Sequence, residues 1–141
     1  MSEWVNEWYV HFSFNQTLVD SSKVDFVNAF RQRTKAAAVR VIKLYQSLPA
    51  TGEAQVLGKQ LLRSATSVAA NYRAVCRALS AKEQYAKLCI CVEEADESQL
   101  WLELLRESSI IAEARVAGLE QEYLEIVSVL EKARSTHRGN E

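Results

Sequence analysis

The sequence has very little of what ends a helix: one proline and four glycines stand among 141 residues. With a hydrophobic content of 48%, that scarcity argues for a mostly helical globular protein rather than for disorder. The length is that of one domain with a substantial core.

Long apolar runs are missing too. No stretch approaches 18 uninterrupted apolar residues, the length that a membrane-spanning helix needs. The first 20 residues begin with Glu3 and Glu7 rather than with lysine or arginine, so the basic start of a signal peptide is absent. We therefore expect a cytoplasmic protein without membrane association.

Histidine is scarce, and His11 and His137 stand at opposite ends of the chain, away from every cysteine. Cys89 and Cys91 are two residues apart and so point about 200° apart around a helix, which prevents them from sharing one ion. We expect these two thiols and Cys76 to be structural, with no metal and no cofactor. The acidic run from Glu93 to Glu97 does not change this, because a di-iron bundle also needs Glu-x-x-His motifs.

Catalytic motifs are absent as well. The chain has no glycine-rich phosphate loop, and its two histidines do not form part of a Ser-His-Asp or Cys-His motif. It also has no long loop that would build a pocket. We therefore expect a protein that is not an enzyme.

What is present is helical periodicity. Apolar spacing predicts helices from residue 22 or 25 to 48, from 53 to 78, from 81 to 108 and from 114 to 134. Pro49 and Gly52 separate the first two, and Ser80 with Glu83 predicts a capping box at the start of the third. Short links between long helices predict an all-α, antiparallel up-down four-helix bundle over residues 23–135.

The second predicted helix has two opposite faces. The core face holds Leu57, Leu61, Ala65, Val68, Tyr72, Val75 and Leu79. The outward face holds Lys59, Arg63, Thr66, Ala70, Arg73 and Arg77, with no acid among them. Small residues from Ser64 to Ala70 allow a neighbouring backbone to approach closely.

The third predicted helix is apolar nearly all round at its end. Leu100, Trp101, Leu104 and Leu105 lie on several sides there, which indicates more than one neighbour. In so short a chain, the additional neighbour could be another subunit.

Several of these elements occur together in a recognisable order: Leu61 to Arg73 (LLRSATSVAANYR), then Cys76-Arg77-Ala78, Ser80, Glu83, and Glu93 to Ser98 leading into Trp101 to Leu105. Over roughly residues 25–135, the sequence resembles the bacterial four-helix bundle family encoded within intervening sequences of 23S rRNA genes. The resemblance implies a homopentameric barrel and a nucleic-acid role. Relatives of that family include accessory proteins of diversity-generating retroelements, which pair with a reverse transcriptase and bind nucleic acid. The family offers no catalytic motif to carry over.

The two ends depart from this pattern. Residues 1–22 hold five aromatic residues and no lysine or arginine, and we expect a poorly ordered N-terminal extension there, although its aromatic side chains could dock on a groove. The polar residues 136–141 are expected to form a frayed tail.

Charge is distributed unevenly, although the net charge is only −1. From Lys23 to Lys87 there are twelve basic and three acidic residues, 12 − 3 = +9, whereas from Leu88 onward there are five basic and twelve acidic residues, 5 − 12 = −7. Residues 1–22 add −3. An up-down bundle would therefore have a basic side and an acidic side.

Two interpretations of that asymmetry remain open. In one, opposite charges pair between helices or subunits and serve only assembly or the docking of a partner such as a reverse transcriptase. In the other, the cations bind RNA or DNA phosphates, through Lys59, Arg63, Arg73 and Arg77 with help from Arg31 and Lys35. We also expect Glu94 or Asp96 to pair with an arginine of the second helix such as Arg63, while Glu93 and Glu97 form a solvated or interfacial row.

Overall fold

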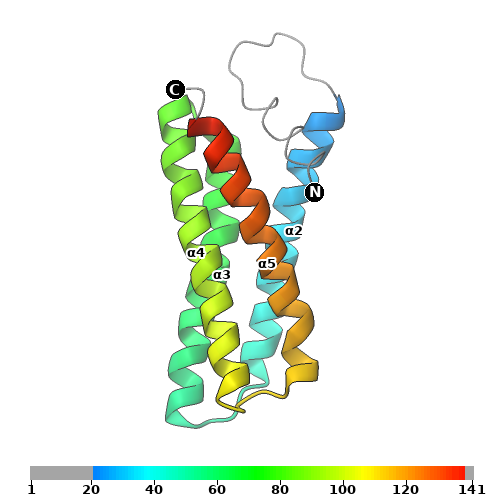
Figure 1. The fold of residues 1–141 in the computed structure, drawn as a ribbon, viewed down its shortest axis with the longest axis vertical. Coiled ribbons are helices and arrows are strands. Elements are labelled where there is room, and N and C mark those ends of the chain that lie inside the picture. Colours follow the sequence, from blue (N-terminus) through cyan, green and yellow to red (C-terminus); the bar gives the residue numbers. More distant parts are fainter. Residues whose placement is uncertain (1–20, 139–141) are drawn as a thin grey trace.

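The structure, a computed structural model, describes residues 21–138 as four helices that run alternately up and down (Figure 1). They are α2 (Ser21–Gln46), α3 (Gly52–Arg77), α4 (Ala81–Glu107) and α5 (Glu113–Arg138), and no strand occurs between residues 21 and 138. The predicted all-α four-helix bundle is thereby confirmed. The pentameric barrel stays a prediction.

The chain ends differ in part from expectation. Residues 1–20 of the predicted N-terminal extension lie outside the described residues, whereas Ser21 and Ser22 already belong to α2. At the other end α5 continues to Arg138, past the predicted stop at Arg134. His137 is therefore helical and buried, and the frayed tail predicted from residue 136 was placed too early.

The core is built from the apolar stripe of each helix. In α3 the predicted residues Leu61, Ala65, Val68, Tyr72 and Val75 are all buried. Leu79 was wrongly assigned to this stripe: it is 88% exposed, because α3 ends at Arg77 and the chain turns towards α4. The contact between α3 and α4 is the most extensive, and that between α2 and α5 is the smallest.

Two local motifs set the ends of α4. At its start the Ser80 hydroxyl accepts a hydrogen bond from the Glu83 N–H at 3.1 Å, which confirms Ser80 as the predicted cap. The Glu83 carboxylate accepts from the Leu79 N–H at 3.1 Å, one residue before the Ser80 N–H that a capping box would use. At its end Ser109 adopts a left-handed φ of 61°. The Ile110 N–H then donates to the Leu105 carbonyl at 3.1 Å, the pattern that closes many helices.

A close approach between α3 and the end of α2 depends on Gly58. A Cβ at this position would collide with the Leu48 side chain and would lie 2.9 Å from Cδ2 of Tyr45. The Tyr45 ring cannot swing away freely, because its hydroxyl donates a 3.2 Å hydrogen bond to Gln55. Glycine inside a helix costs about 1 kcal/mol relative to alanine, and here the close contact explains its presence.

We predict that Gly58→Ala lowers the free energy of unfolding by about 1–2 kcal/mol, since overpacking exceeds the gain in helix propensity. Gly118→Ala is the matched control, because its Cβ would meet only the flexible end of Arg40 at 3.3 Å. That variant should gain up to about 1 kcal/mol. Urea unfolding of both proteins measures the difference, and equal stabilities would contradict the packing argument.

Candidate nucleic-acid interface

A groove between α2 and α3 brings together three of the six predicted cations. It has a volume of about 350 Å³ and is lined by Arg31, Gln32 and Lys35 of α2 and by Ala69, Ala70 and Arg73 of α3. The two alanines leave the space between the helices unfilled, because their side chains end at the methyl group. No acidic residue lines the groove.

An aromatic contact in the core holds the two helices at this level. Phe30 of α2 packs edge-on against Tyr72 of α3, with ring centroids 4.8 Å apart and an interplanar angle of 78°. Both rings are buried. The neighbouring residues Arg31 and Arg73 then lie at the outer side of the same helix pair and line the groove, so the core contact positions the cations.

Arg31 is the most constrained of these cations. Its Nη2 donates a hydrogen bond of 3.2 Å to Oδ1 of Asn28 one turn earlier. Its Nε is buried and has no hydrogen-bond partner among the described residues. A buried N–H donor without an acceptor is costly, and this one belongs to a residue that lines the groove.

Cys76 lies close to the same charges. Burial raises the pKa of its thiol, and the nearby Arg31 and Arg77 guanidiniums partly oppose that rise. Arg77 follows Arg73 by about one helical turn and is exposed. The charges of Arg31 and Arg77 therefore act in the same region, and Arg77 extends the cationic surface beyond the groove.

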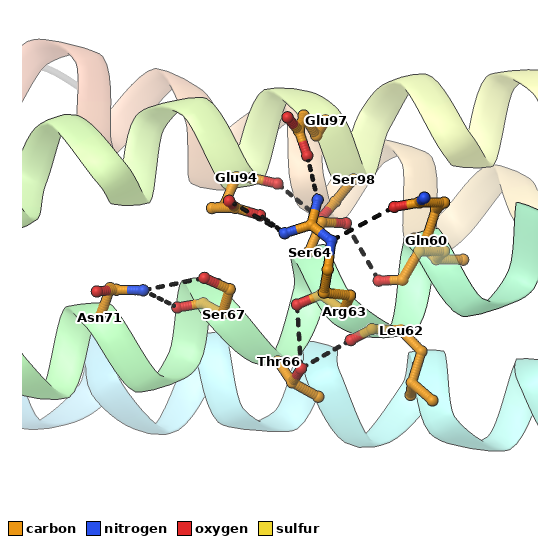
Figure 2. Close-up of polar contacts among 11 residues, drawn as sticks. Gln60, Leu62, Arg63, Ser64, Thr66, Ser67, Asn71, Glu94, Glu97 and Ser98 are labelled. Carbon is orange, nitrogen blue, oxygen red and sulfur yellow. Dashed lines mark hydrogen bonds and ion pairs between the residues drawn. The ribbon is translucent and has the colours of Figure 1, made fainter.

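Arg63 is exposed as expected, but its guanidinium is bound to α4 (Figure 2). Its Nη1 lies 3.0 Å from a Glu94 oxygen and its Nη2 lies 2.6 Å from a Glu97 oxygen. Hydrogen bonding to Glu97, and next to Glu94, raises the pKa of Arg63. The expected pairing with Glu94 is confirmed, and Glu97, which was expected in a solvated or interfacial row with Glu93, also binds Arg63. We leave Arg63 out of the candidate interface.

Lys59 lies apart from the groove. It is exposed on the same helix, fourteen residues before Arg73, which corresponds to about 21 Å along α3. No ion pair joins Lys35, Lys59, Arg73 or Arg77 to an acid within the described part of the chain. The candidate interface therefore consists of Arg77 and the three cations that line the groove. Lys59 is a separate exposed positive charge on the same helix.

Three further ion pairs, made by two arginines, were not predicted individually. Arg33 of α2 contacts Glu122 and Glu125 of α5, the latter at 3.0 Å, and the hydrogen bond to Glu122 is the main reason why the pKa of Arg33 is raised. Arg106 of α4 contacts Glu120 of α5 at 2.8 Å. Some of the basic and acidic residues thus pair between helices, as expected if the charge asymmetry serves assembly.

The small residues of α3 also face α4. The buried hydroxyls of Ser64 and Ser98 lie 2.8 Å apart (Figure 2), so the two helices approach closely there. Asn71 donates to the Ser67 carbonyl oxygen at 2.9 Å and to the Ser67 hydroxyl at the same distance. The small residues around Ser64 predicted that a neighbouring backbone approaches closely, but no pattern in the sequence indicated Ser98 as the residue that contacts Ser64.

No group of three or more potential metal ligands occurs within residues 21–138. Burial raises the pKa of Cys91 to about 12, so this thiol stays protonated and packs as a small apolar side chain. None of the described helices is long and apolar enough to cross a membrane.

We predict that Glu94→Ala lowers the free energy of unfolding by about 0.5–1 kcal/mol, a small amount because the Arg63 pair is partly exposed and Glu97 stays in contact. Glu93→Ala is the control, since Glu93 is exposed and makes no ion pair within the described residues. A double-mutant cycle with Arg63→Gln isolates the pairwise energy. If Glu94→Ala is as stable as the original protein, the pair does not hold α3 on α4.

Comparison with known proteins supports the fold and assigns a family. A search of curated proteins finds no match. A solved structure of a protein with unknown function from the S23 ribosomal protein family of Bacteroides thetaiotaomicron is 32% identical, with a TM-score of 0.71, and the match covers 77% of this chain and 97% of that one. The family model described as 23S rRNA-intervening sequence protein matches residues 28–132. The chain therefore belongs to the 23S rRNA-intervening sequence protein family.

Proposed function

We propose that this protein is not an enzyme and binds nucleic acid, as RNA or an RNA–protein complex, through the groove between α2 and α3. The observation that supports this most directly is the convergence of Arg31, Lys35 and Arg73 from two helices on one hollow without an acidic residue. Phosphate groups are the natural ligand of such a surface, because neutralising them releases condensed counterions. The name of the family refers to ribosomal RNA and the similar structure belongs to a ribosomal protein family, in keeping with a partner that contains RNA.

The positions of the remaining cations extend this proposal along α3. Arg77 lies next to the groove, and Lys59 lies about 21 Å from Arg73. At the rise of about 3.4 Å per phosphate that one strand has along the axis of a duplex, this separation spans roughly six phosphates. A strand held in the groove could therefore also reach Lys59 on the same helix.

Self-association would multiply these charges. We propose that the protein forms a homo-oligomer, a pentamer in the arrangement that the family resemblance implies, in which each copy contributes its groove to a common positive field. Support comes from large apolar side chains that are more than one-third exposed in the described residues: Val39, Ile42, Val56, Leu79, Leu100 and Leu124. They are spread over all four helices and the turn before α4, as a ring with two different contact faces on each subunit requires.

The same exposed side chains favour a second candidate function. The protein could be a scaffold that docks a partner protein, a reverse transcriptase among the candidates, with its charges serving only assembly. In that case the groove would have no affinity for nucleic acid. Binding at low salt distinguishes the two functions.

We predict that a structured RNA binds with an affinity that falls steeply as salt concentration rises. The double variant Arg73→Glu, Arg77→Glu should lose at least about tenfold in affinity and reduce the slope of log affinity against log salt by about two, one for each lost phosphate contact. Electrophoretic mobility shifts over a salt series measure both quantities.

The matched control is Lys132→Glu, which changes an exposed cation of α5 and should leave RNA affinity almost unchanged. Light scattering establishes that every variant keeps the same oligomeric state. An unchanged oligomer that shifts no RNA at low salt would overturn the nucleic-acid proposal and favour the scaffold.

A further inference from the structure

The shape of the groove restricts which part of a nucleic acid can enter it. The hollow lies between two packed helices, whose axes are typically about 8–10 Å apart, so a duplex is too wide to penetrate and can only lie across the rim. Its volume of about 350 Å³ falls at the lower end of the range of roughly 300–1,000 Å³ for sites of small ligands. A strand end or a small charged group fits this space.

The charge of the groove points to the same part of the strand. Three cations line one hollow, whereas each internal phosphodiester of a strand carries a single negative charge. A terminal phosphate monoester carries about −1.5 to −2 at pH 7, and an oligophosphate carries more. A terminal group therefore matches the local charge better than one internal phosphate does.

The donors are also suited to a compact group of phosphate oxygens. Arg31 lines the groove, and the hydrogen bond from its Nη2 to Asn28 limits the movement of its guanidinium. Arg73 can donate two parallel hydrogen bonds and Lys35 supplies a mobile point charge. The methyl groups of Ala69 and Ala70 add no polar atom that would compete for these donors.

We propose that this groove is a binding site for a terminal phosphate or oligophosphate group of a nucleic-acid strand, in preference to its internal phosphodiesters. The inference rests on the proposed function and adds the chemical class that the groove selects. Because Arg77 and Lys59 lie on opposite sides of the groove along α3, phosphate contacts of one or the other would then position the rest of the strand.

The test compares short single-stranded RNAs of one sequence that carry a 5′ hydroxyl, a 5′ monophosphate, a 5′ triphosphate or a 3′ phosphate. Fluorescence anisotropy at constant ionic strength gives their affinities. We expect at least one phosphorylated end to bind at least about tenfold more tightly than the hydroxyl form, the effect of one additional charge-assisted hydrogen bond. Inorganic tripolyphosphate is titrated alone and as a competitor of the RNA, to measure binding of the phosphate group in the absence of a strand.

Two variants test the groove in different ways. Lys35→Gln removes one charge and should abolish most of the preference, whereas the control Lys132→Gln should keep it. Ala70→Leu fills the hollow at an exposed helical position without changing charge, and it should remove the preference while salt-dependent binding of the hydroxyl form persists. Ala114→Leu, exposed on α5, is its steric control.

The outcomes separate this inference from the proposed function. RNAs that bind equally well whatever their ends overturn the inference and leave nucleic-acid binding in place. Tripolyphosphate binding that depends on Lys35 and Ala70, with no RNA bound at low salt, would show a site for free oligophosphate and overturn both the nucleic-acid function and the strand end as its ligand. If neither ligand binds, both proposals are wrong.

Discussion

The rotation of α3 about its own axis is the constraint on which the rest of the structure depends, and the contact with α4 through Ser64 and Ser98 fixes it. The two buried hydroxyls lie 2.8 Å apart. One hydroxyl donates to the other, and the accepting one donates to a carbonyl of its own helix, which is that of Glu94 at 2.9 Å for Ser98 or that of Leu61 at 3.1 Å for Ser64. Both polar groups are then satisfied inside the core. Only small side chains permit this approach. With Ser64 turned towards α4, Ala69 and Arg73 are turned towards α2.

The ion pairs reinforce this arrangement and also decide which cations stay available. Arg63 closes the outer edge of the contact between α3 and α4 by binding Glu94 and Glu97, and Arg33 does the same between α2 and α5. Such exposed or half-exposed pairs contribute little energy each. Their effect on function is larger, because they assign acids to particular arginines and leave the groove between α2 and α3 without any.

The sequence predicts the helices well because their periodicity is a local property. The apolar stripe of α3, the capping signal at Ser80 and the outward face of Lys59 and Arg73 follow from spacing alone. The groove could not be predicted in this way, because it depends on which face of α2 meets α3 and on the level at which Phe30 meets Tyr72. Leu79 shows the limit of periodicity, since the pattern continues past the residue where the helix ends. Arg63 shows the limit of counting charges, because its partners are set by tertiary contact.

The charges at the groove are unfavourable for the protein alone, which supports the proposal that they bind a ligand. Three like charges around one hollow repel each other, and an unpaired buried Nε on Arg31 is unfavourable. A sequence adjusted for stability alone would place a larger apolar side chain at Ala69 or an acid beside Lys35, and elsewhere the chain does supply acids to Arg33, Arg63 and Arg106. The arginines that bind acids join neighbouring helices, whereas no cation of the groove makes an ion pair within the described residues, and other exposed cations such as Arg40 and Lys132 make none either. What distinguishes the groove is that three cations from two helices share one hollow, and this supports the proposal of an anionic partner.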